Sequence, residues 1–384
     1  MNFDLTDEQQ VVADLAAQVF DGQTSIERIK QAERDQDFDR RLWAELAGTN
    51  LLGLCLPESV GGSGMGVVAL ALLCQAQGAT VAPIPLLPTV AAAMSLADAV
   101  AGDGADPSAR HHFGEVLAAA VAGTAVLTVA LNQGGANDVL SPTVAATPTG
   151  NGYHVRGWLP TVPYLAQADH VVVPAMVGDE VAMFLVDVND TGVDAEAVRT
   201  TDLQPAAHLR LDLTIAANRR FGDADALARL RDVWLVGQAS TVVGVAESAV
   251  RQTAQYLVSR EQFGRSLASF QAVGQRAADA YITTEAIRVT TLNAAWRIDE
   301  GLDASEDVSI AAFWAADGGQ SVTLACQHLH GGIGADVDYP IHRFFLWAAR
   351  LANTAGTASS HLARLGTSIA IRHGRPSQPQ ECAP

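Results

Sequence analysis

The sequence predicts a mainly α-helical protein with a central β-domain, on three observations. Helical patterning runs from residue 6 to about 119, short β-rich runs follow as far as 221, and four long helix-compatible stretches come after Asp223. We therefore expect an N-terminal helical domain over 1–120, a middle β-domain over 121–222 and a C-terminal four-helix bundle over 223–372. A flexible tail is expected over 373–384.

The composition is typical of a folded protein and restricts the classes of ligand that it can bind. Apolar residues make up 49% of the 384, which is enough for a sizeable buried core. The formal charge of −18 disfavours nucleic acid and anionic membrane surfaces as partners, so a polyanionic ligand would need a local basic site. The four cysteines are widely spaced without a Cys-x-x-Cys pair, which predicts reduced thiols in a cytoplasm and neither a zinc site nor a disulfide framework.

The N-terminal domain is expected to begin at a helix cap. Thr6-Asp7-Glu8-Gln9 is a capping-box pattern at the start of an amphipathic helix, and the acidic N-terminus does not have the character of a signal peptide. Glycines and Pro57 predict a loop over 57–64. The apolar run 116–131 is too short for a membrane span, so we interpret it as a core helix that leads into a strand.

The middle domain and the bundle follow from the change in periodicity. Strands are predicted at 125–130, 152–157, 170–175, 181–186 and 208–213, and Pro160 and Pro163 disfavour a regular ladder strand just after Trp158. Long helices are predicted at 224–259, 270–300, 305–330 and 341–371, whose lengths suit a four-helix bundle.

Arg260 is a candidate phosphate contact near the end of the first bundle helix. A guanidinium is a permanently charged fork that a pyrophosphate can share. A solvated arginine that pairs with Glu261 or with the helix dipole is the alternative, and it would be preferred if Arg260 stood alone. Phe263-Gly264 and Phe270-Gln271, which follow closely, favour the phosphate.

A second motif, Gly331-Gly332-Ile333-Gly334, follows the third predicted bundle helix. Glycines let a backbone adopt positive φ and approach the adenylate end of a dinucleotide, although a glycine C-cap and turn is the simpler alternative. His328 and His330, two residues apart, point to different sides of a helix. They are therefore expected to be structural histidines, and no metal site is predicted.

These motifs together resemble the C-terminal half of the acyl-CoA dehydrogenases. The resemblance rests on the segments at Arg260 and Gly331, on the Gly-Thr pair at 356–357, and on the Pro-Glu-x-x-Gly-Gly loop at 57–62, and it covers nearly the whole chain. It implies the helical, β and bundle order, FAD as cofactor and an acyl-CoA substrate. The FAD-binding residues that it implies are Arg260, Gln262, Phe263, Gln271, Gln327, His328, Gly331, Gly332 and Thr357. The family usually has Gln in the slot of His328, and here Gln327 lies one residue earlier.

The family's catalytic glutamate is missing from both of its usual positions. One slot, before the Gly-Thr pair, holds Ala355, and the other, on the first bundle helix, falls at Trp234. Asp232 is about a turn away and is an alternative base, but beside Arg231 at the start of a long helix it is more simply a first-turn charge. Leu235 occupies the arginine slot of the family's Asp-x-x-Arg pair. The middle-domain segments 130–138 and 157–163 also depart from the family, which predicts a degraded pocket for the flavin ring.

The resemblance then implies a division of labour between unlike chains. This chain resembles the base-less subunit of actinobacterial steroid-side-chain dehydrogenases, which are α2β2 heterotetramers. It would bind the ADP half of FAD, while an unlike partner supplies the glutamate and electron-transfer flavoprotein accepts the electrons. Two alternatives remain: a self-sufficient homotetramer with an unusual base or with monooxygenase chemistry, and a structural paralogue that binds no flavin.

Overall fold

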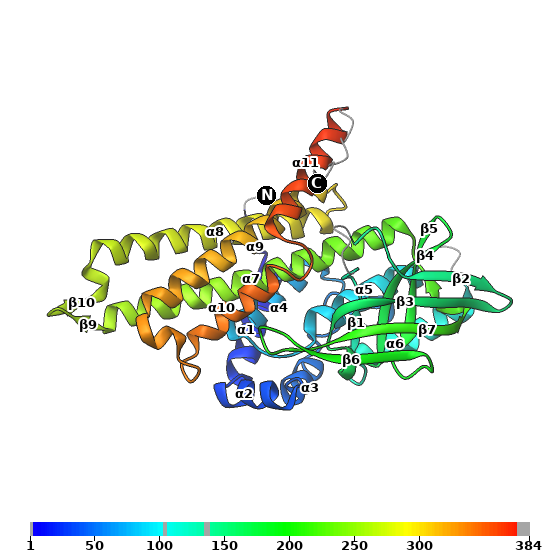
Figure 1. Ribbon diagram of the computed structural model, residues 1–384, viewed down its shortest axis with the longest axis horizontal. Coiled ribbons are helices and arrows are strands. Elements are labelled where there is room, and N and C mark those ends of the chain that lie inside the picture. The colour runs from blue at the N-terminus through cyan, green and yellow to red at the C-terminus, as the bar shows by residue number, and fades with distance from the viewer. Residues whose placement is uncertain (1–2, 103–105, 134–138, 375–384) are drawn as a thin grey trace, which may run out of the picture.

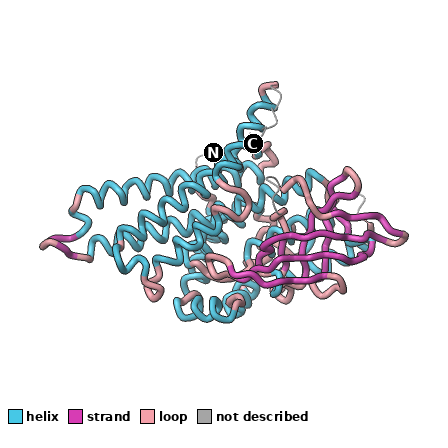
Figure 2. The backbone as a smooth tube through the Cα atoms, in the orientation of Figure 1, coloured by secondary structure: helices cyan, strands magenta, loops and turns pink. Residues whose placement is uncertain are grey.

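The structure, a computed structural model, describes residues 3–102, 106–133 and 139–374 (Figure 1). A sheet lies toward one end of the long axis, and long helices extend to the other end, where a small hairpin closes the molecule (Figure 2). The predicted order of helices, sheet and bundle is confirmed. The domain boundaries themselves stay a prediction, and from residue 375 onward the predicted tail lies outside the described residues.

The N-terminal part consists of helices that share one core with the start of the bundle. Thr6 caps the first of them through the predicted capping box with Gln9. Most residues of the fourth and fifth helices are buried. The helices are α1 (Asp7–Gln23), α2 (Ile26–Asp35), α3 (Arg40–Gly48), α4 (Gly66–Thr80), α5 (Leu86–Ala101) and α6 (Pro107–Val121).

The middle part is one mixed sheet in the order β6-β7-β3-β2-β4-β5-β8, with β1 paired in parallel to β4. Its strands are β1 (Leu127–Val129), β2 (Ala145–Thr149), β3 (Gly152–Pro163), β4 (His170–Val177), β5 (Glu180–Asp187), β6 (Val193–Arg199), β7 (Pro205–Ala216) and β8 (Arg220–Phe221). The five predicted strands are present. Strand β3 continues through Pro160 to Pro163, and its register against β7 shifts between Leu159 and Val162, so the ladder is irregular where the prolines predict it to be.

The bundle is built from α7 (Ala224–Ser259), α8 (Gln271–Asp299), α9 (Ser305–Leu329) and α10 (Ile341–Leu351). The prediction of one helix over 341–371 is wrong, because the chain breaks and restarts as α11 (Ala358–Arg372), which projects from the bundle (Figure 1). Gly356 explains the break. Its φ is +121°, and a Cβ there would lie 2.7 Å from the Ser360 hydroxyl and 3.0 Å from the His361 ring.

Within the described residues, α7 is the one helix with the length and apolar composition of a membrane span. Most of its apolar window is buried inside the protein, so it is a core helix. Cys55, Cys74 and Cys326 are free and buried. No group of three or more His, Cys, Asp or Glu side chains suited to a metal ion gathers in the part of the chain that the structure describes.

Candidate functional site

Eight of the nine predicted cofactor residues lie at one end of the bundle, which we call the open end. Helix α7 ends there at Ser259, and a hairpin of β9 (Glu261–Gln262) and β10 (Arg265–Ser266) leads into the start of α8. Helix α9 also ends there, and the short helix η5 (Gly331–Ala335) follows it. The antiparallel helices thus bring together two motifs that are about 70 residues apart in the chain.

Arg260 is exposed at the open end and makes no ion pair with any described residue. Beyond it, the Phe263 side chain is 90% exposed on a backbone with a φ of +56°. Gln262 and Gln271 are exposed as well. A free guanidinium beside an exposed aromatic ring and amides can bind a phosphate and an adenine-bearing ligand.

The residue just before the glycine turn, His330, is held by a stacked pair of rings that was not predicted from the sequence. The rings of Tyr256 and His330 stack with centroids 4.5 Å apart, and the Tyr256 hydroxyl donates to the His330 carbonyl at 3.4 Å. Burial lowers the pKa of His330. Tyr256 lies one turn before Arg260 on the same helix face, and this spacing is the signal that could have identified it.

The backbone of the glycine turn that follows this stack is accessible to a ligand. Gly331 has a φ of +65°, and nothing lies within 4 Å of a Cβ added at Gly331 or Gly332. The Gln327 side chain donates to the Gly334 carbonyl at 3.0 Å and so holds the turn, whereas His328 is exposed. His330 is buried and His328 is exposed, so the two side chains point to different sides, as their spacing predicts. The open end therefore fits the ADP half of FAD.

The ninth predicted residue, Thr357, lies away from the open end. It is the N-cap of α11, and its hydroxyl accepts from the Ser360 amide at 3.3 Å. Helix α10, of about 16 Å, separates it from the glycine turn. Its side chain thus has a structural role in this chain, and a contact with the flavin stays a proposal.

The two glutamate slots lie at the opposite end of the bundle, which we call the filled end. Trp234 is 5% exposed and stands about 38 Å along α7 from Ser259. With Trp347 and Thr354 it lines a cavity of only about 80 Å³. Ala355, next to Thr354, packs against the main core. Ligand pockets of drug-sized molecules have volumes of roughly 300–1,000 Å³, so this cavity is well below the size of a usual ligand site.

A polar network fills the remaining space. Asp202 is the one carboxylate that lines this cavity, and it lies 3.9 Å from the Arg350 guanidinium and accepts from the Gln204 amide at 2.7 Å. Burial raises the pKa of Asp202, and Arg350 opposes that rise. Arg350 also donates to the Thr354 hydroxyl at 2.6 Å. The network satisfies its own members, and it is not arranged as a free base beside a substrate. The network was not predicted from the sequence, because Asp202 and Arg350 are far apart in the chain.

The interpretation of Asp232 as a first-turn charge is wrong, because α7 begins eight residues earlier, at Ala224. Asp232 is instead paired with Arg231 at 2.8 Å, with both side chains largely buried. It does not line the cavity beside Trp234. Its carboxylate is therefore engaged in an ion pair and is not free to act as a base.

Comparison with known proteins identifies the fold. Models described as acyl-CoA dehydrogenase N-terminal domain and C-terminal domain match residues 6–101 and 236–370. Acyl-CoA dehydrogenase FadE27 of Mycobacterium tuberculosis is 36% identical to this chain, over 96% of this chain and 99% of its own length. Acyl-CoA dehydrogenase FadE28 of the same organism is 30% identical over 97% and 100%.

Two solved structures match with a TM-score of 0.90. One is a variant of the Tcur3481-Tcur3483 steroid ACAD, 40% identical over 96% of this chain and 99% of that one. The other is the ChsE4-ChsE5 complex from Mycobacterium tuberculosis, 36% identical over 98% and 100%. FAD is the cofactor of the family that these matches define, as the sequence predicts. The chain belongs to the acyl-CoA dehydrogenase family of oxidoreductases.

Proposed function

We propose that this chain is the base-less subunit of a heteromeric acyl-CoA dehydrogenase. In this proposal it binds the ADP half of FAD at the open end, and an unlike family member supplies the glutamate, the ring pocket and the substrate slot. The observation that carries the proposal is the filled end: both glutamate positions hold other residues, and the small cavity beside Trp234 is lined by the Asp202–Arg350 network.

The division of labour follows from what the reaction needs. A carboxylate must remove the α-proton of the thioester in a water-poor slot. When bound, FAD accepts the hydride from the β-carbon. In this chain, Arg260, Phe263 and the backbone at Gly331 would hold the diphosphate and adenylate side, while no described residue at the filled end is available as the base.

The surface of the bundle supports a protein partner. Large apolar side chains are exposed on α7, α8 and α9, on the neighbouring α11 and at the open end, more than on the rest of the described surface. Such apolar surface is typical of a protein–protein interface. The residues are Val258, Phe263, Tyr281, Ile282, Leu324, Ile333, Val337, Leu362, Ile369 and Ile371.

The choice of partner and substrate rests on the similar structures. Both are named as pairs of chains, and one is named a steroid ACAD. We therefore propose an unlike acyl-CoA dehydrogenase chain as partner in a heterotetramer, a steroid-side-chain acyl-CoA as substrate of the complex, and electron-transfer flavoprotein as acceptor. A cytoplasmic location stays a prediction.

Co-expression with a family member encoded beside this chain tests the proposal. The isolated chain should be poorly flavinated and inactive on steroid-side-chain and straight-chain acyl-CoA thioesters, whereas the purified complex should be yellow and active. The flavin content of the complex should be lower than one FAD per chain. Steady-state turnover by the isolated, FAD-loaded chain would refute the proposal.

A further inference from the structure

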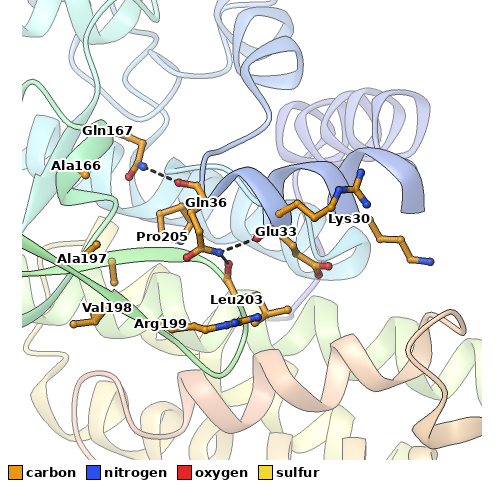
Figure 3. A pocket seen from close by; sticks show the side chains of 12 residues that line it. Lys30, Glu33, Gln36, Ala166, Gln167, Ala197, Val198, Arg199, Leu203 and Pro205 are labelled. Atoms are coloured by element: carbon orange, nitrogen blue, oxygen red, sulfur yellow. Dashed lines mark hydrogen bonds between the residues drawn. The ribbon is translucent and has the colours of Figure 1, made fainter.

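A cleft of about 540 Å³ separates α2 from the edge of the sheet (Figure 3). One wall carries Lys30 and Glu33 of α2, and the facing wall carries Arg199, the last residue of β6, with Leu203 and the start of β7. Hydrogen bonds from Gln167 to the Gln36 carbonyl and from Gln36 to the Leu203 carbonyl, at 2.9 and 3.2 Å, join the two walls. The two walls are thus linked directly, and the cleft lies away from the open end of the bundle.

The charge of the cleft is opposite to that of the protein. Lys30, Arg34 and Arg199 line it, in a chain whose formal charge is −18. The one carboxylate that lines it belongs to Glu33, and Arg343 neutralises that group through two contacts of 2.7 and 2.8 Å. A concave site with excess cations attracts anions even when the whole molecule repels them.

Two of the three cations have no carboxylate partner among the described residues. Lys30 is paired with Asp338 at 2.5 Å. Arg34 donates only to the Gln31 amide oxygen, at 2.6 Å, and it also complements the C-terminal dipole of α2. Arg199 makes no side-chain hydrogen bond or ion pair in the described chain. Its guanidinium has no structural use in the fold and is free for a ligand.

Apart from Gln36 and Gln167, the rest of the lining is apolar. Ala166, Val198, Leu203 and Pro205 supply the apolar lining on the side of the cleft formed by the sheet. A volume of about 540 Å³ is within the usual range for a small-molecule site. A ligand that matches this surface has an apolar body and one anionic head.

We propose that this cleft binds an amphipathic anion, with a phosphate or carboxylate head on Arg199 and Arg34 and an apolar body on Leu203 and Pro205. Arg199 is the residue with the largest share of the binding, because a bidentate contact with an oxyanion is the strongest interaction the cleft offers. The cleft lies away from the cofactor end. It borders the cavity beside Trp234, with which it shares Pro205, but neither Trp234 nor Ala355 lines it.

Hexyl phosphate, hexanoate and inorganic phosphate are the probes that test it, titrated calorimetrically into the purified full chain. Hexyl phosphate or hexanoate should bind saturably and more tightly than inorganic phosphate, and the tighter of the two identifies the head group. Arg199→Gln should weaken that binding about tenfold, and Arg34→Gln by less. Arg210→Gln, an exposed arginine on β7 that does not line the cleft, is the matched control and should change nothing.

Lys30 supplies an independent readout, because it is the only lysine in the sequence. Its side chain is partly exposed at the cleft, so a bound probe should slow its acylation by an amine-specific reagent, as measured by peptide mass spectrometry. The protection should be lost in Arg199→Gln. Absence of saturable binding, an equal loss in Arg210→Gln, or unchanged Lys30 acylation at saturating probe would overturn the proposal. None of these readouts depends on FAD or turnover, so the site is tested separately from the proposed function.

Discussion

The open and filled ends of the same helical bundle differ in whether their polar side chains have partners within the protein. At the open end, Arg260 has no ion-pair partner among the described residues and Phe263 is almost fully exposed. At the filled end, Trp234 is buried and Arg350 is engaged with Asp202 and Thr354. The difference shows how the two kinds of site can be told apart. At a ligand site, polar side chains lack partners within the protein. At a site that has been lost, the polar side chains are paired with one another.

Replacing Trp234 should have the largest effect. Trp234→Ala removes a buried indole beside an existing cavity, so the free energy of unfolding should fall by about 3–5 kcal/mol. Denaturant titration of the purified complex measures this, and added indole should recover part of the loss. Trp158→Ala, where the side chain is 46% exposed, is the control. An equal loss in the two variants would mean that the filled end is not a packed plug.

His361 should make the filled end sensitive to acid. Burial and the neighbouring Arg364 lower its pKa to about 4, from an ordinary value of 6.5. Between these values the unfolded chain binds a proton that the folded chain does not, so the free energy of unfolding falls with falling pH, by up to about 3 kcal/mol. His361→Gln should lose this part of the pH dependence, measured from pH 7 to 4. His328→Gln, which changes an exposed histidine, should keep it, and identical profiles for all three proteins would contradict the assignment.

Arg260→Ala should weaken FAD binding by the complex. A charge-assisted pair with the diphosphate would be lost, at a cost of about 1.5–3 kcal/mol, so FAD occupancy after gel filtration should drop while the melting temperature of the FAD-free complex stays unchanged. Arg41→Ala, an exposed arginine on α3, should leave FAD occupancy as it is. Unchanged flavin content in Arg260→Ala would mean that Arg260 is a solvated surface residue without a phosphate contact. It would also favour the alternative that the chain is a structural paralogue.

Ala355→Glu should have the smallest effect, because restoring the carboxylate does not restore the slot. Proton abstraction needs a thioester held within reach, and the cavity of about 80 Å³ leaves no room for one. We expect no turnover from the isolated variant and no gain in turnover per complex. A doubled rate would show that only the base is missing and that the two ends are less different than the structure indicates.

Sequence periodicity was sufficient for the long elements and for the open end. The bounds of α7 agree with the prediction to the residue, because its apolar pattern and its Asp223 cap are local signals. Strands β2, β6 and β8 were not predicted, since β2 contains a proline, β6 is mostly exposed and poor in β-branched residues, and β8 has only two residues. The break before α11 depends on the backbone at Gly356, which helix periodicity does not reveal. The missing base was visible as Ala355 and Trp234, but the network of Asp202 and Arg350 forms only when distant segments pack together.

The Asp202–Arg350 pair also bears on how such a chain could change over generations. Removing either partner leaves a buried charge without compensation, and shrinking Trp234 leaves a hole, so each single step back toward a catalytic slot passes through a less stable protein. Several substitutions would have to arrive together before any benefit appeared. Once the catalytic slot of a duplicated family member had been filled in this way, its dependence on an unlike partner would be hard to reverse.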